Sequence, residues 1–233
     1  MGSVIQTEQL CKSYYVGKRE IPVLKRMELA IEEGEFVSIM GPSGCGKSTL
    51  LYLLGGIDVP TSGSVYFKRE DINKMNDKKK SMIRRRQLGF VFQFYNLVQN
   101  LTVAENILLP ITMDGKKSKD YQDELNEKLE IVGLTDRRNF TPRELSGGQQ
   151  QRVAIARALI VNPKVILADE PIGNLDSKSG TAIMELFRKI NQEKGITIVQ
   201  VTHSQEAAKY GNRIIHMKDG VIESDSMVAK VKV

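Results

Sequence analysis

A glycine-rich segment early in the chain has the residue types and spacing that bind phosphate groups. Residues 41–48 read GPSGCGKS, which matches the spacing G-x-x-x-x-G-K-[ST] of a phosphate-binding loop. Glycines let the loop wrap closely around phosphates, and the helix that follows adds the partial positive charge of its N-terminus. We expect Lys47 to reach the β- and γ-phosphates and the Ser48 hydroxyl to bind Mg²⁺. The predicted nucleotide-binding residues here are Gly41, Pro42, Ser43, Gly44, Cys45, Gly46, Lys47, Ser48 and Thr49.

Two adjacent carboxylates supply what a nucleoside triphosphate site still lacks. Asp169 follows the apolar run 165–168, and Glu170 is the next residue. Because α/β proteins bind ligands at the carboxyl ends of their strands, this pair is expected beside the phosphate loop. Asp169 can then support the Mg²⁺ shell, and Glu170 can orient or deprotonate the attacking water. Such a pair could also be the ordinary start of a helix. In a chain that also has the phosphate loop, a role in the nucleotide site is the better interpretation of the two carboxylates.

A second glycine-containing segment predicts another helix start that binds anions. Residues 145–152 read LSGGQQQR, so Ser146 and two glycines stand before a predicted helix. This run resembles the signature of the ATP-binding cassette (ABC) family. In that family two subunits pair head to tail, and each signature covers the ATP on the other subunit's phosphate loop. The resemblance therefore implies an ATP-dependent homodimer in which the signature residues bind ATP. These residues are Ser146, Gly147, Gly148 and Gln149.

The same resemblance implies roles for residues that spacing alone would not identify. Gln93 is similar to the catalytic glutamine that contacts Mg²⁺ and the attacking water, and residues 94–96 would face the membrane partner. Residues 174–176, Asn-Leu-Asp, resemble the loop that lies across the dimer interface. His203 resembles the histidine that bonds the γ-phosphate. Taken alone, a histidine there would more often be structural, but its place after the predicted strand 196–201 favours the catalytic role.

Two neighbouring tyrosines are candidates for binding the adenine base. Tyr14, in the run Lys12-Ser13-Tyr14, resembles the aromatic residue that stacks on adenine in the family. Tyr15 is the competing candidate, and we favour Tyr14.

The resemblance covers residues 4–223 and extends to a subgroup of the family. The runs GFVFQFYNL and EPIGNLD are most similar to the lipoprotein-release, macrolide-export and antimicrobial-peptide-resistance ATPases. Two positions depart from those relatives: Ile172 stands where threonine is usual, and Ser204 replaces the aspartate that usually follows the histidine. Neither departure removes a ligand or a proton acceptor, so ATP hydrolysis is still expected.

The elements that must position these residues alternate between strand and helix, which predicts an α/β fold with a mostly parallel sheet. We expect a single ABC ATPase domain, 1–233, with a P-loop NTPase core, an N-terminal antiparallel β portion and an inserted helical subdomain. The core comprises 1–93 and 163–233, and the helical subdomain comprises 94–162, where no convincing strand is found. Strands are expected at 35–40, 165–168 and 196–201, and a hairpin turn is expected at 219–220. Helices are expected at 47–54, from a cap at Ser118 to Gly133, and at 149–161. A further long helix after the strand 165–168 is expected to end at 194.

Composition is that of an ordinary globular protein: 41% of the 233 residues are hydrophobic and 27% are charged. The two cysteines form no disulfide framework, which favours a reducing compartment. Apolar runs are too short to span a membrane. The net charge is +6, and much of the excess lies in residues 74–86. That stretch is either a solvated helix face or a surface for anionic lipid or nucleic acid.

These observations predict the ATP-binding and ATP-hydrolysing subunit of an ABC transporter, with ATP and Mg²⁺ bound, which powers a separate integral membrane permease. Export or peptide resistance is the expected type. The subunit would lie peripherally at the cytoplasmic face of the membrane and be soluble when isolated. The alternative is a soluble ABC ATPase acting on nucleic acid, and a scaffold without hydrolysis is a third reading. We expect no nucleic acid, because the chain has neither a long coiled-coil insertion nor a second cassette.

Overall fold

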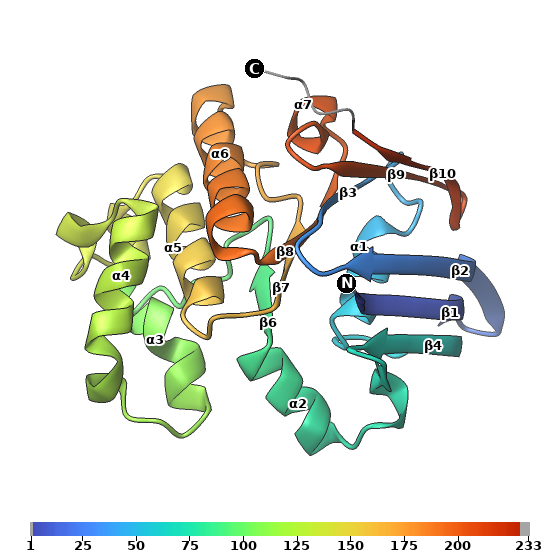
Figure 1. The fold of residues 1–233 in the computed structure, drawn as a ribbon, viewed down its shortest axis with the longest axis horizontal. Helices are drawn as coiled ribbons and strands as arrows, with labels where there is room; N and C mark the ends of the chain where they lie inside the picture. The colour runs from blue at the N-terminus through green and yellow to red at the C-terminus, as the bar shows by residue number, and fades with distance from the viewer. Residues whose placement is uncertain (1, 229–233) are drawn as a thin grey trace.

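The structure, a computed structural model, describes residues 2–228 and places their ten strands in two sheets (Figure 1). The first sheet has four strands in the order β2-β1-β4-β5, and its neighbouring strands are all antiparallel. It is the N-terminal antiparallel portion that the sequence predicted. Its strands are β1 (Ser3–Val16), β2 (Arg19–Glu32), β4 (Ser62–Phe67) and β5 (Glu70–Asp71).

The second sheet has six strands in the order β10-β9-β3-β8-β7-β6, and only the pair β9–β10 is antiparallel. Strands β3, β7 and β8 are buried along their whole length. Burial on both faces explains why they form largely apolar runs in the sequence. Asp219 and Gly220 make the predicted two-residue turn, both with positive φ. The strands are β3 (Phe36–Met40), β6 (Leu88–Val91), β7 (Val165–Asp169), β8 (Thr197–Thr202), β9 (Arg213–Lys218) and β10 (Val221–Met227).

The helices follow the predicted order, with two corrections. Ser118 does not cap a long helix: it begins a short 3₁₀ helix, and α4 starts at Gln122. The signature helix α5 begins at Gly147, where the side chain of Ser146 caps it, and ends at Leu159. The α-helices are α1 (Lys47–Leu54), α2 (Asp77–Arg86), α3 (Val103–Met113), α4 (Gln122–Val132), α5 (Gly147–Leu159), α6 (Ser177–Lys194) and α7 (Gln205–Ala208). The 3₁₀ helices are Ile72–Lys74, Ser118–Tyr121, Thr135–Arg137 and Pro142–Glu144.

The parallel sheet lies between two hydrophobic cores. One core joins alternate side chains of β7, such as Ile166, to α3, α4, α5 and α6. The other joins the intervening side chains, such as Leu167, to α1 and the antiparallel sheet. Helices α3, α4 and α5 gather at one side of the molecule (Figure 1). No helix within residues 2–228 is long and apolar enough to span a membrane.

Parallel strands bring the predicted site residues together, because the carboxyl ends of β3, β7 and β8 meet at one edge of the sheet. The glycine loop follows β3, Asp169 ends β7 with Glu170 next, and His203 follows β8.

Candidate nucleotide-binding site

The loop between β3 and α1 has a backbone that only glycine can adopt at two positions. A Cβ on Gly41 (φ +155°) would lie 2.2 Å from the carbonyl oxygen of Met217, and one on Gly46 (φ +100°) would lie 2.8 Å from a methyl of Leu24. The Nζ of Lys47 donates hydrogen bonds to the carbonyls of Gly41 (2.8 Å) and Pro42 (3.0 Å). The loop therefore encloses the ammonium group of its own lysine. Loop and ammonium group together form a cradle whose size and charge suit a phosphate. Pro42, Ser43 and Gly44 form its exposed rim, and Cys45 is buried beneath it.

A hydroxyl and a carboxylate lie together beside this loop. The Ser48 hydroxyl donates to Oδ1 of Asp169 at 2.8 Å. The other carboxylate oxygen, Oδ2, accepts a hydrogen bond from the hydroxyl of Tyr52 at 2.7 Å. Tyr52 stands one helical turn after Ser48 on α1, and no motif in the sequence predicted its role. Burial first, and then the bond to Asp169, raise the pKa of Tyr52 to about 12, so its hydroxyl remains a donor at neutral pH.

The pair of Ser48 and Asp169 fits a small hard cation that takes oxygen ligands. Mg²⁺ is commonly held by one or two protein oxygens, with substrate phosphates and waters completing its octahedron. Within residues 2–228 no group of three or more His, Cys, Asp or Glu side chains could hold a metal ion. A site with few protein ligands is therefore the kind that these residues can form.

Glu170 sits in a strained position next to this pair. Its φ of +44° is rare for a residue with a side chain, and such conformations cluster at functional sites. Its Oε1 lies 3.0 Å from Nδ1 of His203. Its Oε2 is buried and has no hydrogen-bond partner within the described residues. A buried carboxylate oxygen without a partner is costly, and a water molecule bound there would satisfy it.

Gln93 is hydrogen-bonded to Asn174 rather than to the Ser48–Asp169 pair. Its side-chain nitrogen is 3.5 Å from Oδ1 of Asn174, and its carbonyl accepts from the amide of Asn174 at 3.0 Å. No hydrogen bond among residues 2–228 joins Gln93 to Ser48 or Asp169. The structure thus links Gln93 to the loop 174–176, in which Asp176 also caps α6.

Arg157 binds the segment that follows Gln93. No motif in the sequence predicted this role of Arg157. Its guanidinium donates to the carbonyls of Asn96 (2.6 Å) and Tyr95 (2.7 Å). Both of those residues have positive φ, 51° and 62° respectively. The Tyr95 hydroxyl reaches the signature: a Cβ on Gly147 would lie 2.9 Å from it. Arg157 on α5 therefore fixes a strained turn that contacts the start of the same helix.

The N-terminus of the signature helix α5 is capped as predicted, and it lines a pocket separate from the phosphate loop. Ser146 and Gln149 form a reciprocal capping box: the Ser146 hydroxyl accepts from the Gln149 N–H, and the Gln149 side chain accepts from the Ser146 N–H. An open cavity of about 460 Å³ lies in front of them. Its lining comprises Ser146, Gly148, Gln149, Arg152, Asp176, Lys178, Ser179 and Ala182. No residue of the phosphate loop lines it, so one chain does not bring its own two helix starts into a single pocket.

Of the two tyrosines, Tyr14 is the one tied to the structure near α1. Its hydroxyl donates to Oδ2 of Asp58 at 2.8 Å, and the ammonium of Lys12 lies 4.8 Å from its ring centroid. Burial, and then the bond to Asp58, raise the pKa of Tyr14, while a hydrogen bond with Thr49 lowers it. The Tyr15 side chain is 64% exposed, against 42% for Tyr14. The bond to Asp58 therefore ties Tyr14 to the segment that follows α1.

Ile172 and Ser204, the two departures from the related sequences, both have structural roles. Ile172 packs against the core formed by α3 to α6. The Ser204 side chain accepts a hydrogen bond from the N–H of Ala207 and so caps α7. Ser204 thereby does what an aspartate could do at a helix start.

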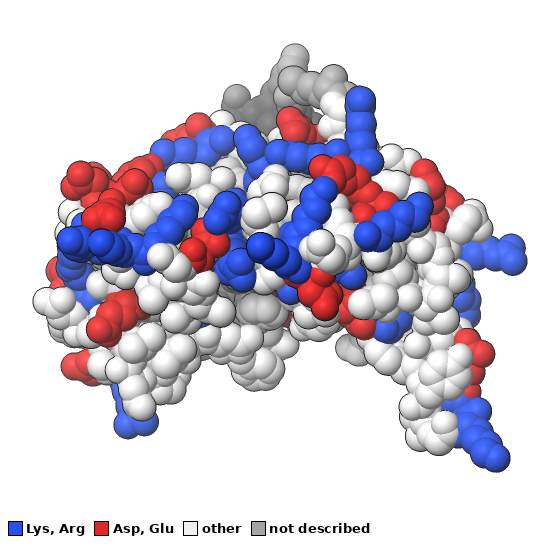
Figure 2. Space-filling view, turned by 90° about the horizontal axis from the view of Figure 1, so that it is seen from below, with Lys and Arg blue, Asp and Glu red and all other residues white. Residues whose placement is uncertain are grey.

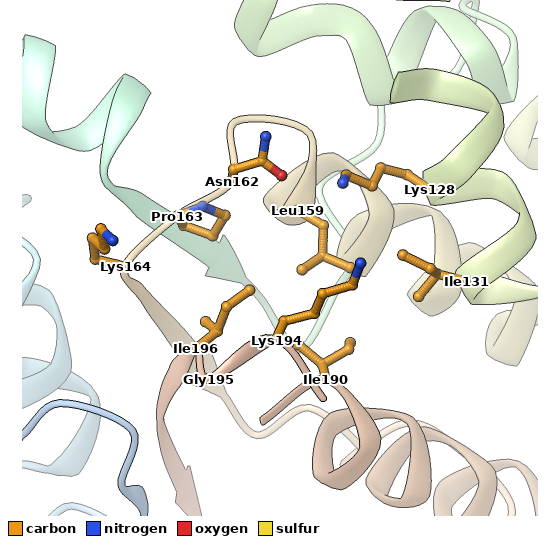
Figure 3. A pocket seen from close by; sticks show the side chains of 10 residues that line it. All are labelled: Lys128, Ile131, Leu159, Asn162, Pro163, Lys164, Ile190, Lys194, Gly195 and Ile196. Carbon is orange, nitrogen blue, oxygen red and sulfur yellow. The ribbon is translucent and has the colours of Figure 1, made fainter. Parts of the chain in front are cut away.

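A separate cavity of about 240 Å³ lies at the opposite ends of the strands, where β7 and β8 begin (Figure 3). Figure 3 shows Lys128 and Lys194 on its wall. The two ammonium groups share the carboxylate of Glu127, each at 2.9 Å. Helices α5 and α6 both end beside the cavity, and a helix C-terminus favours positive charge. These contacts account for the lysines, and the cavity is not part of the nucleotide site.

Taken together, a glycine cradle at a strand–helix junction, a paired hydroxyl and carboxylate, and a second capped helix start define a P-loop nucleotide-binding cassette. Residues 24–173 match the family model described as ABC transporter. The chain belongs to the ABC transporter family.

Similar proteins span almost the whole chain. An uncharacterized ABC transporter ATP-binding protein of Methanocaldococcus jannaschii is 52% identical over 220 residues, which cover 94% of this chain and 97% of that protein. The lipoprotein-releasing system ATP-binding protein LolD of Geobacter metallireducens is 43% identical, with 97% of this chain and 100% of LolD covered.

Solved structures of ABC cassettes have the same fold as this chain. The dimeric ATP-binding cassette MJ0796 of Methanocaldococcus jannaschii, in a post-hydrolysis state bound to ADP and Pi, has 45% identity and a TM-score of 0.88, and covers 96% of this chain and 98% of its own. CbiO1 from Clostridium perfringens, part of the ABC transporter complex cbiONQ, has 28% identity and a TM-score of 0.86, with 97% and 89% covered. The predicted family and α/β P-loop fold are confirmed, and nothing in these likenesses supports the nucleic-acid alternative.

Proposed function

We propose that this chain is the ATP-binding and ATP-hydrolysing subunit that powers a separate integral membrane permease. The observation that carries this function is the edge of the sheet where Ser48 and Asp169 are paired beside Glu170 and His203. LolD among the relatives belongs to a lipoprotein-releasing system. We infer a permease of that export or peptide-resistance class, with the subunit held peripherally at the cytoplasmic face of the membrane.

In the proposed mechanism the phosphate end of ATP is bound by the glycine loop. Lys47 leaves the carbonyls of Gly41 and Pro42 and turns its ammonium group to the β- and γ-phosphates. Ser48 and Asp169 would hold Mg²⁺, and Gln93 would be a further contact if its bond to Asn174 were exchanged. Mg²⁺, when bound, supplies positive charge that stabilises the charge on the phosphate oxygens. Tyr14 stacks on the base, and Thr49 lines the same end of the site.

Glu170 is the proposed general base. Its unpartnered Oε2 accepts a hydrogen bond from the attacking water and then the proton, while Oε1 stays bonded to His203. That bond holds the carboxylate in position, and the exposed imidazole can also reach the γ-phosphate. Both groups follow adjacent parallel strands, so their spacing is set by the sheet.

The second half of the site comes from another copy of the chain. Ser146, Gly148 and Gln149 line a pocket that contains no residue of the phosphate loop. A head-to-tail homodimer satisfies both halves at once, with two ATP molecules between the subunits.

A groove next to the turn held by Arg157 is the proposed docking site for the permease. It has a volume of about 380 Å³ and an apolar floor, and it lies between α2, β6, α3 and α5. Its apolar residues include Phe90, Phe92, Leu109, Pro110 and Met113. We propose that the helical subdomain 94–162 moves against the core, 1–93 and 163–233, as the dimer closes. Residues 1 and 229–233 of that core lie outside the described part.

Replacing Glu170 with Gln tests this function. The amide keeps the shape of the carboxylate but cannot take a proton, so ATP turnover is expected to fall by about 10² to 10⁴. ATP binding should persist, and the variant should accumulate as an ATP-bound dimer in size-exclusion chromatography. Glu185→Gln, on α6, is the matched control and should leave turnover unchanged. Near-parental turnover by Glu170→Gln would contradict the assignment.

A further inference from the structure

The positive charge of this protein is concentrated on one surface. Residues 70–86 and 114–120 together contain ten Lys or Arg and five Asp or Glu, a net charge of +5 out of +6 for the whole chain. We call these two segments the basic surface. Asp114 joins them, because its carboxylate accepts from Arg85 at 3.3 Å and from Arg86 at 2.8 Å. Figure 2 views the molecule from the side of α2 and shows lysine and arginine side chains in a band across it.

Much of this charge is not neutralised within the molecule. Lys74 pairs with Asp71, and Lys79 pairs with Glu70. Lys78, Lys117 and Lys119 are exposed and have no ionic partner within residues 2–228. The rest of the molecule carries basic and acidic residues in nearly equal number, which is enough to keep a surface solvated. Solvation alone therefore does not explain why the excess positive charge is concentrated here.

The basic surface borders the groove proposed for the permease. Arg84 and Arg85 of α2 line one side of that groove, and Pro110 and Met113 of α3 line the other. Met113 is 66% exposed and lies three residues before Lys116 in the sequence. A permease that enters the groove comes from the bilayer, so the surface around the groove is turned toward the membrane. This step depends on the proposed function.

We propose that the basic surface binds the anionic headgroups of the membrane in which the permease lies. The surface of an anionic bilayer has a negative potential that attracts clustered Lys and Arg, and the attraction falls off within about 8 Å at physiological ionic strength. Each unpaired lysine near the headgroups should strengthen binding about fivefold. The headgroup contact would orient the subunit with its groove toward the permease. Nucleic acid would meet the same charge, but a groove for a permease gives no reason for nucleic acid to lie beside it.

Vesicle sedimentation of the full chain, without any permease, tests this proposal. Binding to phosphatidylcholine vesicles that contain phosphatidylglycerol should exceed binding to phosphatidylcholine alone and should weaken as salt is added. The double variant Lys78→Gln/Lys117→Gln should lose about 25-fold in binding. The control Lys189→Gln/Lys209→Gln has the same net charge and alters residues of or next to α6 and α7, at the other end of the molecule (Figure 1), so it should bind like the parent.

Equal binding to both vesicle types, or equal losses in the two double variants, would overturn the proposal. So would binding of duplex DNA that depends on Lys78 and Lys117 while anionic vesicles are ignored. ATP turnover by the isolated chain should be unchanged in both double variants. A failure of the proposed function would appear in turnover by Glu170→Gln, and a failure of this inference would appear only in vesicle binding.

Discussion

The hydroxyl of Tyr52 donates a 2.7 Å hydrogen bond to Oδ2 of Asp169, while the Ser48 hydroxyl donates to Oδ1 at 2.8 Å. Both oxygens of one carboxylate are thus held by residues one turn apart on the same helix. Asp169 is 8% exposed, so a rotation of its carboxylate would break buried hydrogen bonds. Tyr52 therefore keeps Oδ1 directed at the oxygen with which it would share the metal.

Tyr52→Phe should weaken the binding of Mg²⁺ by the enzyme more than it destabilises the fold. The ring stays in place and one hydrogen bond is lost, which costs about 1 kcal/mol of stability. Groups that orient a metal ligand typically change metal affinity about tenfold or more. The Mg²⁺ concentration for half-maximal ATP turnover should therefore rise about tenfold. Tyr66→Phe removes a comparable tyrosine–carboxylate bond, to Glu8, and should leave it unchanged. An unaltered Mg²⁺ requirement in Tyr52→Phe would contradict the positioning role.

Selectivity for the nucleotide base should be weak. Stacking tolerates any base and contributes about 1–3 kcal/mol, and the Tyr14 hydroxyl is already bonded to Asp58 rather than free to bind a base. ATP should be preferred over GTP by less than about tenfold. Tyr14→Ala should weaken both nucleotides to a similar extent, whereas Tyr15→Ala should weaken neither, as measured by fluorescent-nucleotide displacement. A hundredfold preference for ATP would reveal a group that recognises the purine edge, and a larger loss in Tyr15→Ala would assign the stacking to that residue.

Arg157 should matter for coupling to the permease more than for hydrolysis alone. Its guanidinium binds two carbonyls of a turn with positive φ, and glutamine cannot reproduce both bonds. In Arg157→Gln, ATP turnover by the isolated chain should persist, while the increase in turnover caused by the permease should be lost. Arg188→Gln, on α6, is the control. The role would be refuted if both kinds of turnover fell in parallel.

Asp114 should make the free energy of unfolding depend on pH in the acidic range. The hydrogen bond from Arg86, which outweighs burial, lowers the pKa of the Asp114 carboxyl. The unfolded carboxyl titrates near about 3.9. The stability it contributes is therefore fully present above that pH and is lost as the pH falls through the lower pKa of the folded state. Asp114→Asn should be less stable at neutral pH but should lose less stability on acidification. Urea unfolding at several pH values measures this, with Asp136→Asn as the control. Parallel stability curves for Asp114→Asn and the parent would contradict it.

Local patterns in the sequence predicted much of this site, and packing decided the rest. The phosphate loop and the pair of Asp169 and Glu170 were predicted from the spacing of a few neighbouring residues, and the signature was predicted from its resemblance to the family. The bond of Tyr52 joins α1 to β7, and the two bonds of Arg157 join α5 to a distant turn, which no local pattern records. Ser118 is a case of the same kind. It has the side chain of a helix cap, yet the chain forms a 3₁₀ turn there before α4 begins.

Turnover by mixtures of inactive chains tests the composite site most directly. In the proposed site, Lys47 and Glu170 would act on ATP bound to their own chain, whereas Ser146 would act on ATP bound to the partner. A mixture of Lys47→Ala and Ser146→Arg chains therefore forms mixed dimers with one whole site, and ATP turnover should return. A mixture of Lys47→Ala and Glu170→Gln chains forms no whole site and should stay inactive. If the first mixture were as inactive as the second, although its chains were folded and paired, the proposed head-to-tail site would be wrong.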